Sequence, residues 1–203
     1  MNIKDRFLRY VKIDTQSDSD SLSSPSTKKQ LDLSRLLVEE LKALNAKKVI
    51  LDKFGIVYAV VPGNVPGAKK IGLVAHVDTA SEMSGKHVKP RLIRNYQGDD
   101  IILNAKKNIV MKVEEFPHLK RVIGQDIVVT DGTTLLGADD KAGVAIIMDV
   151  IRYLNDHPKI PHGDIKIAFT PDEEIGRGVE NFDVKYFDAD FAYTLDGSDM
   201  QVI

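Results

Sequence analysis

The 203-residue chain contains no cysteine and no tryptophan. The absence of cysteine excludes disulfide bonds, thiolate zinc sites, iron–sulfur clusters and a cysteine nucleophile. No apolar run approaches the ~18 residues that a membrane-spanning helix needs, and the first residues, Met1 to Arg6, lack the apolar stretch of a secretory signal peptide. We therefore expect a soluble, cytoplasmic protein with no membrane partner.

A strong charge of either sign is also missing. There are 28 Lys+Arg against 30 Asp+Glu, which gives a formal net charge of -2. This balance, without a basic stripe along the chain, predicts that nucleic acid is not a partner. Hydrophobic residues make up 43% of the chain, which is enough for a buried core and argues against wholesale disorder.

Apolar residues alternate between helical and strand patterns along the chain. Helical spacing predicts helices over residues 28–44 and 141–154. Thr27 and Gln30 have the spacing of a capping box before the first of these. Continuous apolar or β-branched runs predict strands at 49–51, 56–61, 71–75, 101–103, 127–129, 165–169 and 191–195. The alternation predicts an α/β fold with a mixed, mostly parallel sheet and helices on both faces.

Polar groups follow three of the predicted strands. His76 and Asp78 follow the strand predicted at 71–75, residues 172–174 (Asp-Glu-Glu) follow the strand at 165–169, and Asp196 follows the strand at 191–195. Residues 137–141 (Gly-Ala-Asp-Asp-Lys) precede a helix. In open α/β sheets, sites gather at the carboxyl ends of strands. Each group alone has a structural explanation: a core histidine, a charged helix cap or a solvated acidic pair.

Together, these groups indicate a cation site. Clustered carboxylates repel and raise one another's pKa, and a cation relieves that cost. One imidazole with several carboxylates suits zinc, manganese or cobalt better than calcium. In His76-x-Asp78 the acid is placed to hold the second ring nitrogen. Of the neighbours Glu173 and Glu174, one can bind a metal while the other handles a proton of an activated water.

Four segments together resemble the M20 family of co-catalytic zinc peptidases. They are His76-Val77-Asp78-Thr79-Ala80, Gly137-Ala138-Asp139-Asp140-Lys141-Ala142-Gly143, Thr170-Pro171-Asp172-Glu173-Glu174-Ile175-Gly176 and Tyr193-Thr194-Leu195-Asp196-Gly197. They occur in the family's order with similar separations, and the resemblance runs through essentially the whole chain. The segments are most similar to the family's tripeptide aminopeptidases. The resemblance therefore implies a metal-dependent aminopeptidase that releases the N-terminal residue of tripeptides, with small peptides as substrates.

The same resemblance implies a ligand set. His76 and Asp196 would bind the first of two Zn²⁺ ions, Asp139 would bridge both, and Glu174 would bind the second. Mn²⁺ or Co²⁺ could replace Zn²⁺. The peptide bond between Asp139 and Asp140 is often cis in the family, but loss of the closing histidine and the lid could relax it to trans, so both forms stay open here.

Two catalytic roles are implied as well. Asp78 would orient the imidazole of His76, and Glu173 would be the general base that takes a proton from the attacking water. Loss of Glu173 should then slow hydrolysis by ~10²–10⁴-fold.

The chain also departs from the family's pattern. Family members place a further histidine on the second metal, beyond the segment that contains Asp196, and insert a lid domain before it. The histidines here are at positions 76, 87, 118, 157 and 162. By the resemblance, residues 1–203 would be the N-terminal portion of a catalytic domain, with the lid domain and the C-terminal return segment absent. We expect one Zn²⁺ or none in this chain, weak or no activity, and an exposed apolar surface that promotes homo-oligomers.

Three other functions compete with this interpretation. An M20-type dipeptidase or deacylase would share the metal residues and differ in its substrate. A phosphoacceptor signalling domain also places paired acids, Thr and Lys at strand ends, but such domains use magnesium and need no imidazole, so His76 argues against one. A catalytically inert, metal-free fragment is the third.

Overall fold

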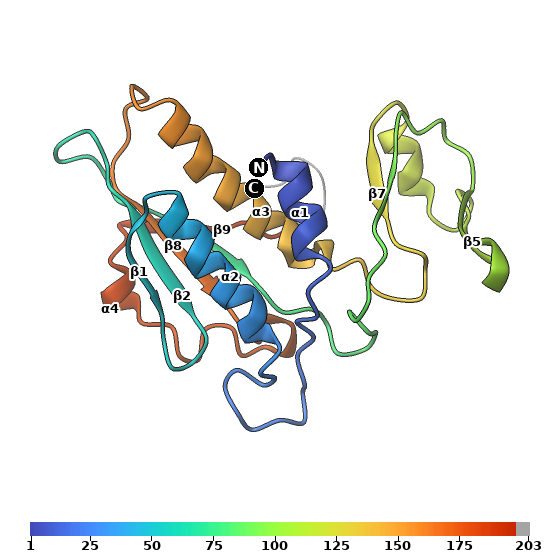
Figure 1. The fold of residues 1–203 in the computed structure, drawn as a ribbon, viewed down its shortest axis with the longest axis horizontal. Helices are drawn as coiled ribbons and strands as arrows, with labels where there is room; N and C mark the ends of the chain where they lie inside the picture. The colour runs from blue at the N-terminus through green and yellow to red at the C-terminus, as the bar shows by residue number, and fades with distance from the viewer. Residues whose placement is uncertain (198–203) are drawn as a thin grey trace.

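The computed structural model describes residues 1–197 of the chain. A five-stranded sheet in the order β1-β2-β8-β3-β9 forms the centre of its larger part (Figure 1). The strands are β1 Lys47–Leu51, β2 Val57–Val61, β3 Ile71–His76, β8 Ile165–Thr170 and β9 Phe191–Thr194. β3 pairs in parallel with both β8 and β9, whereas β2 is antiparallel to both β1 and β8. Because only β2 runs against the others, the predicted mixed, mostly parallel sheet is confirmed.

The strand register brings three carboxyl ends to one edge of the sheet. Ile71 is opposite both Ile165 of β8 and Phe191 of β9, and His76 is opposite Thr170. The apolar run of β8 is buried from its second residue onward, as expected for a strand covered on both faces. Side chains that directly follow β3, β8 and β9 are therefore neighbours in space.

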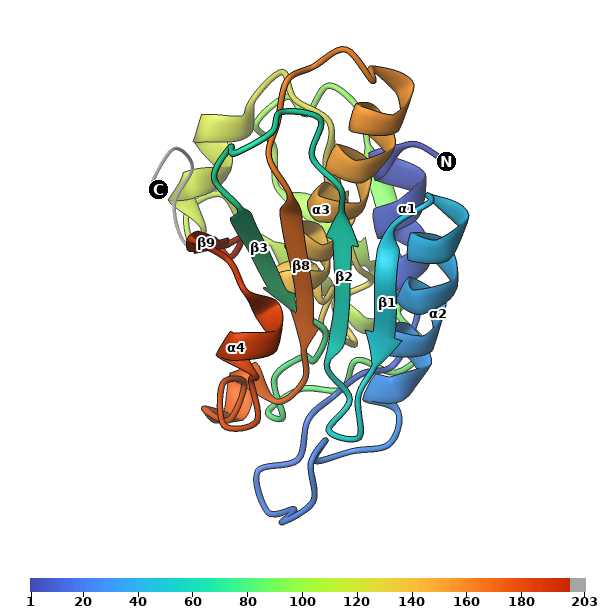
Figure 2. The same ribbon diagram turned by 90° about the vertical axis from the view of Figure 1, so that its left-hand side faces the viewer.

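Helices cover the two faces of the sheet unequally. In Figure 2, α1 Ile3–Tyr10, α2 Gln30–Ala43 and α3 Ala138–Asp156 lie on one side of the sheet, and the short α4 Val184–Phe187 lies on the other. Leu33, Leu37 and Leu41 repeat every four residues along α2 and are fully buried in the main core, as helical periodicity requires. On the opposite face, Phe187 and Tyr58 belong to a smaller core. The prediction of helices on both faces is confirmed.

The start of α2 differs from the sequence prediction. The capping box is wrong, because α2 starts at Gln30 and its N-cap residue, Lys29, makes no side-chain cap. The side-chain amide of Gln30 is instead buried against Asp172. α3 is bounded by Ala138, but its backbone angles are non-helical at Asp139 and Asp140, so the regular helix begins at Lys141, where it was predicted.

A small lobe lies between β3 and α3 in the chain. It contains two two-stranded sheets, β4–β7 and β5–β6, around the buried residues Tyr96, Ile101, Leu119 and Val129. Its elements are β4 Arg91–Ile93, β5 Ile101–Asn104, η1 Ala105–Lys107, β6 Ile109–Met111, η2 Pro117–Val122 and β7 Ile127–Val129. β5 and β7 confirm predicted strands, while the three-residue strands β4 and β6 were not predicted.

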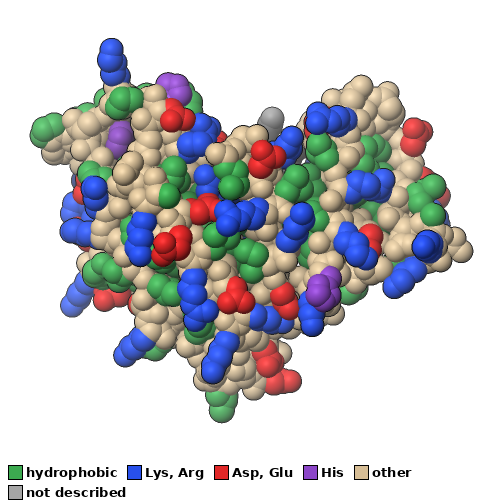
Figure 3. All heavy atoms as spheres, in the orientation of Figure 1, with side chains coloured by type: hydrophobic (Ala, Val, Ile, Leu, Met, Phe, Trp, Pro, Cys, Tyr) green, Lys and Arg blue, Asp and Glu red, His purple; other side chains and the backbone are tan. Residues whose placement is uncertain are grey.

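The lobe stands apart from the main sheet on the right of Figure 1, and the space-filling view shows the surface hollowed between the two parts (Figure 3). Lysine, arginine and acidic side chains are interspersed over the face shown in Figure 3. Within residues 1–197, no helix is both long enough and apolar enough to cross a membrane.

Candidate metal centre and active site

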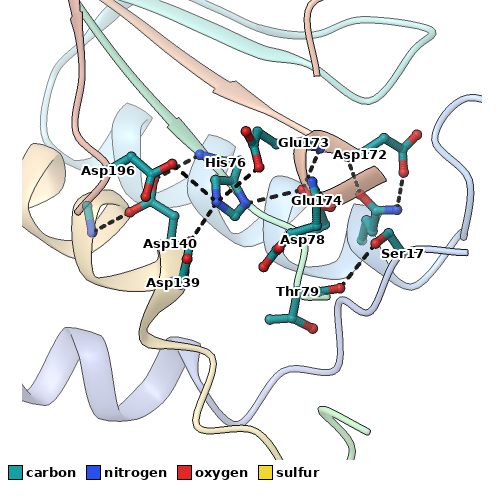
Figure 4. A network of polar contacts seen from close by, with 12 residues as sticks. Ser17, His76, Asp78, Thr79, Asp139, Asp140, Asp172, Glu173, Glu174 and Asp196 are labelled. Atoms are coloured by element: carbon teal, nitrogen blue, oxygen red, sulfur yellow. Dashed lines mark hydrogen bonds and ion pairs between the residues drawn. The ribbon is translucent and has the colours of Figure 1, made fainter. Parts of the chain in front are cut away.

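His76 lies at the centre of the candidate site. It is the last residue of β3 and is almost completely buried. Three carboxylates face its Nε2 atom: Asp139 Oδ1 at 2.9 Å, Glu173 Oε2 at 3.8 Å and Asp196 Oδ2 at 3.9 Å. The acids come from the start of α3, from the 3-10 helix η3 Glu173–Ile175 that follows β8, and from the residues after β9. In Figure 4, dashed lines join one nitrogen of the imidazole to each of these carboxylates.

Three of these residues are spaced as metal ligands are. Ligating atoms of His76, Asp139 and Asp196 all lie within 4.8 Å of one another. The imidazole is buried, while the side chain of Asp139 is 62% exposed and that of Asp196 36%, so the group opens to solvent on its carboxylate side. One nitrogen and two carboxylates are a donor set that Zn²⁺ binds, with room for a water. The residues present therefore fit a divalent metal.

Asp78 connects the imidazole with the two glutamates. Its Oδ1 lies 3.3 Å from His76 Nδ1. The same oxygen accepts a hydrogen bond from the backbone N–H of Glu173 (3.0 Å), and Oδ2 accepts one from the N–H of Glu174 (3.1 Å). The Asp78 side chain is fully buried. One carboxylate thus fixes both the ring orientation and the turn that carries the glutamate pair.

Asp140 holds the opposite side of the site, a role that the sequence analysis did not assign. Its Oδ2 accepts a hydrogen bond from the backbone N–H of His76, and its Oδ1 accepts one from Gly143, each at 3.1 Å. Burial raises the pKa of Asp140 to about 7, partly offset by the nearby His76. Of the two forms left open for the peptide bond between Asp139 and Asp140, the structure has the cis form.

The electrostatics are those of acids crowded around one imidazole. Burial lowers the pKa of His76, but the contact with Asp78 and the charges of Asp78, Asp140 and Asp139 outweigh burial and raise the pKa to about 10. The pKa of Glu174 is raised by burial first and by the charge of Asp139 second. A divalent cation would relieve this repulsion and take the place of a proton on the imidazole.

The predicted site residues do not all lie equally near His76. Glu173 approaches the ring, whereas Glu174 lies outside the 4.8 Å group and reaches Asp78 through its backbone. Asp172, the first acid of the same segment, points away from His76 (Figure 4) and is buried against Ser26 and Gln30. The sequence contains a signal for the glutamate pair but none for these partners, which are 142 and 146 residues from Asp172 in the chain.

Comparisons with known proteins find similar peptidases. A family model described as peptidase family M20/M25/M40 matches residues 130–201. Peptidase T from Alkaliphilus oremlandii is 52% identical over 202 residues, covering 98% of this chain and 49% of the relative. Peptidase T from Clostridium botulinum is 52% identical over 197 residues, covering 97% and 48%. The chain thus spans about half the length of the curated relatives it matches.

Two solved structures share the fold. The aminopeptidase PepT of Bacillus cereus aligns with a TM-score of 0.70 at 24% identity, over 98% of this chain and 43% of that chain. A tripeptidase from Staphylococcus aureus aligns with a TM-score of 0.68 at 25% identity, over 98% of this chain and 43% of that chain.

Proposed function

Because this chain belongs to peptidase family M20/M25/M40, we propose that it carries the metal centre of an aminopeptidase that releases the N-terminal residue of tripeptides. One observation carries the proposal: His76, Asp139 and Asp196 meet within 4.8 Å, with a glutamate, Glu173, at the same imidazole nitrogen. The peptidase T relatives and the tripeptidase neighbour support the substrate class.

In this proposal His76 and Asp196 would hold the first Zn²⁺, Glu174 would hold the second, and Asp139 would contribute to both sites. Mn²⁺ or Co²⁺ would suit the same donors. When bound, the metal would act as a Lewis acid toward the peptide carbonyl and lower the pKa of water. The buried carboxylate of Asp78 holds the ring so that Nε2 faces the open side.

Glu173 is the proposed general base. Its carboxylate is 49% exposed and lies 3.8 Å from His76 Nε2, so it can reach both the metal residues and solvent. It would take a proton from the water that attacks the peptide carbonyl and return a proton to the leaving amine. Its backbone N–H is held by Asp78, which limits the positions of the side chain.

The 203-residue polypeptide by itself is proposed to be a weak peptidase. Among residues 1–197, the ligands assigned to the second metal are Asp139 and Glu174 alone, one fewer than a catalytic zinc normally has. Occupancy of the first position through His76, Asp139 and Asp196 does not depend on that ligand. The assignment of residues 1–203 to the N-terminal portion of a catalytic domain, and the cytoplasmic location, stay predictions.

Peptide hydrolysis tests the proposal. We expect cleavage of tripeptides with free N-termini in the presence of Zn²⁺ or Mn²⁺, and a loss of ~10²–10⁴-fold for Glu173→Gln, because only the acid–base group is removed. Glu39→Gln, on the exposed surface of α2, is the matched control and should leave the rate unchanged. Equal turnover of wild type and Glu173→Gln would contradict the assignment.

A substrate series separates the alternatives. Preferred cleavage of dipeptides, or of N-acylated amino acids, over tripeptides would favour an M20-type dipeptidase or deacylase built on the same metal residues. Absence of metal binding and of hydrolysis under all conditions would favour the inert fragment.

A further inference from the structure

Asp172 is the first acid of the segment that carries the glutamate pair, yet it does not face the metal centre. Its side chain is 1% exposed and is directed toward the start of α2. Its Oδ2 accepts a hydrogen bond from the backbone N–H of Ser26 (2.7 Å), and its Oδ1 accepts from the Ser26 hydroxyl and from Gln30 Nε2 (2.6 Å). Gln30 also accepts, through Oε1, a hydrogen bond from the backbone N–H of Asp172 (3.1 Å).

The backbone of Asp172 needs this support. Its φ is 61°, in the left-handed region, which non-glycine residues adopt at a cost, although Asp and Asn tolerate it better than most. Its carbonyl accepts the N–H of Arg177, and the guanidinium of Arg177 donates to the carbonyls of Ser21 (2.9 Å) and Ser23 (3.0 Å). The Ser-rich loop and the glutamate segment are thus joined at several points.

The left-handed turn at Asp172 determines where the next two residues lie. Immediately after it, the N–H groups of Glu173 and Glu174 both point to the carboxylate of Asp78. Asp172 fixes one side of this turn through Ser26 and Gln30, and Asp78 fixes the other side through the two amides. Burying a carboxylate on each side of the turn costs free energy. A turn that only connected β8 to the next element would not require that cost.

We infer that Asp172 is a positioning residue, which acts with Ser26 and Gln30 to hold the turn that presents Glu173 and Glu174 to the metal centre. Loss of its hydrogen bonds would free the turn without removing any group from the site. The catalytic consequence of this inference rests on the proposed function, but its structural content does not.

Amide hydrogen exchange tests the structural content. Asp172→Asn keeps the size and the tolerance of a left-handed backbone but replaces one accepting oxygen with a donor, opposite Ser26 or Gln30. We expect exchange at the Glu173 and Glu174 amides to accelerate at least about tenfold, the size of effect typical of a lost hydrogen bond to a charged group. The Ala168 amide, within β8, is the internal reference and should not change.

Three further variants separate positioning from general destabilisation. Asp183→Asn removes a carboxylate that caps α4 through the N–H of Tyr186 and should leave the Glu173 and Glu174 amides unchanged. Gln30→Met removes the other half of the contact at nearly constant size and should reproduce the Asp172→Asn effect. The double variant should add little to either single change, because both remove the same hydrogen bonds.

Kinetics then test the catalytic consequence, in this chain or in a longer form that turns over tripeptides. Asp172→Asn should lower kcat by about tenfold or more with KM nearly unchanged, because the general base is misplaced while substrate contacts remain. Unchanged exchange at Glu173 and Glu174 in both Asp172→Asn and Gln30→Met would overturn the inference. Absence of hydrolysis in every form would instead count against the proposed function. The amide-exchange result would still test the positioning role of Asp172.

Discussion

The carboxylate of Asp78 links the imidazole of the site to the turn that carries the glutamate pair. It contacts His76 Nδ1 and accepts the amides of Glu173 and Glu174. For Asp78→Asn we predict a loss of ~10–100-fold in Zn²⁺ affinity, as for other groups that orient a metal-bound histidine, and a loss of ~1–3 kcal/mol in the free energy of unfolding.

Calorimetric Zn²⁺ titration and urea denaturation measure these two effects. Asp52→Asn is a matched control, because Asp52 also accepts two backbone amides, those of Phe54 and Ile56, in the turn between β1 and β2. It should lose stability but keep its Zn²⁺ affinity. Equal Zn²⁺ affinity in Asp78→Asn and wild type would remove the positioning role of Asp78.

Gly143 sets the distance between α3 and the segment that carries Asp196. A Cβ atom there would lie 2.0 Å from the carbonyl oxygen of Leu195 and 2.4 Å from Asp140 Oδ1. We predict that Gly143→Ala destabilises the fold by ~1–3 kcal/mol, as overpacking does, and also weakens Zn²⁺ binding, because the helix must move away from Leu195. Gly197→Ala has open space around its Cβ and should be neutral in thermal unfolding; equal melting temperatures for the two variants would contradict this account.

At the scale of elements, the sequence was informative where a pattern was long and uninterrupted. The apolar runs of β3, β8 and β9 and the leucine repeat of α2 produced predictions that lie within two residues of the observed bounds. β4, β6 and β7 have three residues each, but only β7, Ile-Val-Val, is β-branched throughout, which is the composition that strand prediction relies on. The supposed capping box at Thr27 and Gln30 failed because a distant residue, Asp172, competes for the amide of Gln30.

The site residues follow the same logic. His76, Asp139, Glu174 and Asp196 could be predicted to share one edge of the sheet, because each follows a strand or precedes a helix there. In the structure His76, Asp139 and Asp196 lie together, and the glutamate that approaches the imidazole is Glu173. Asp140 could not be assigned its role, because its contacts with His76 join positions 64 residues apart through backbone atoms that have no sequence signature.

In the lobe, the carboxylate of Asp131 is held by hydrogen bonds. Asp131 accepts hydrogen bonds from the N–H and hydroxyl of Thr133 and from Lys89 Nζ (2.9 Å). These contacts lower the pKa of Asp131 to about 2, from an ordinary value of 3.8. An acid whose pKa is lower in the folded chain than in the unfolded chain stabilises the fold at pH values above its unfolded-state pKa. This stabilisation is lost as the pH falls through the folded-state pKa.

Asp131→Asn should therefore lower the melting temperature at pH 7 and have less effect as the pH falls from about 4 to about 2. Thermal unfolding of both proteins across this range measures the difference. A difference in melting temperature that stays constant with pH would show that the charge of Asp131 does not contribute. Asp99→Asn, which changes an acid elsewhere in the lobe, is the control.

At the scale of the whole molecule, the two edges of the sheet are protected differently. β1 begins with Lys47 and Lys48 and has an irregular register with β2, features that discourage pairing with another sheet. β9 is exposed along its length, and it presents Phe191 and Tyr193. A cleft of about 900 Å³ next to it is lined by Leu73, Ile146 and Tyr193 among others.

We predict that the 203-residue chain self-associates through this edge. Sedimentation velocity should show a concentration-dependent increase in mass, and Tyr193→Lys should reduce it, because an edge lysine opposes strand pairing. Ile102→Lys, at an exposed apolar residue of the lobe, is the control. A monomer at all concentrations, or equal association of both variants, would contradict this prediction.

The central claim is that His76, Asp139 and Asp196 form a metal site, and calorimetric titration with Zn²⁺ tests it most directly. We predict one Zn²⁺ bound per chain, with binding abolished in His76→Ala and weakened in Asp139→Asn. His118→Ala, at an exposed histidine of the lobe, should bind Zn²⁺ as the wild type does. Zn²⁺ binding of equal affinity and stoichiometry in wild type and His76→Ala, or no binding to the wild type, would contradict it.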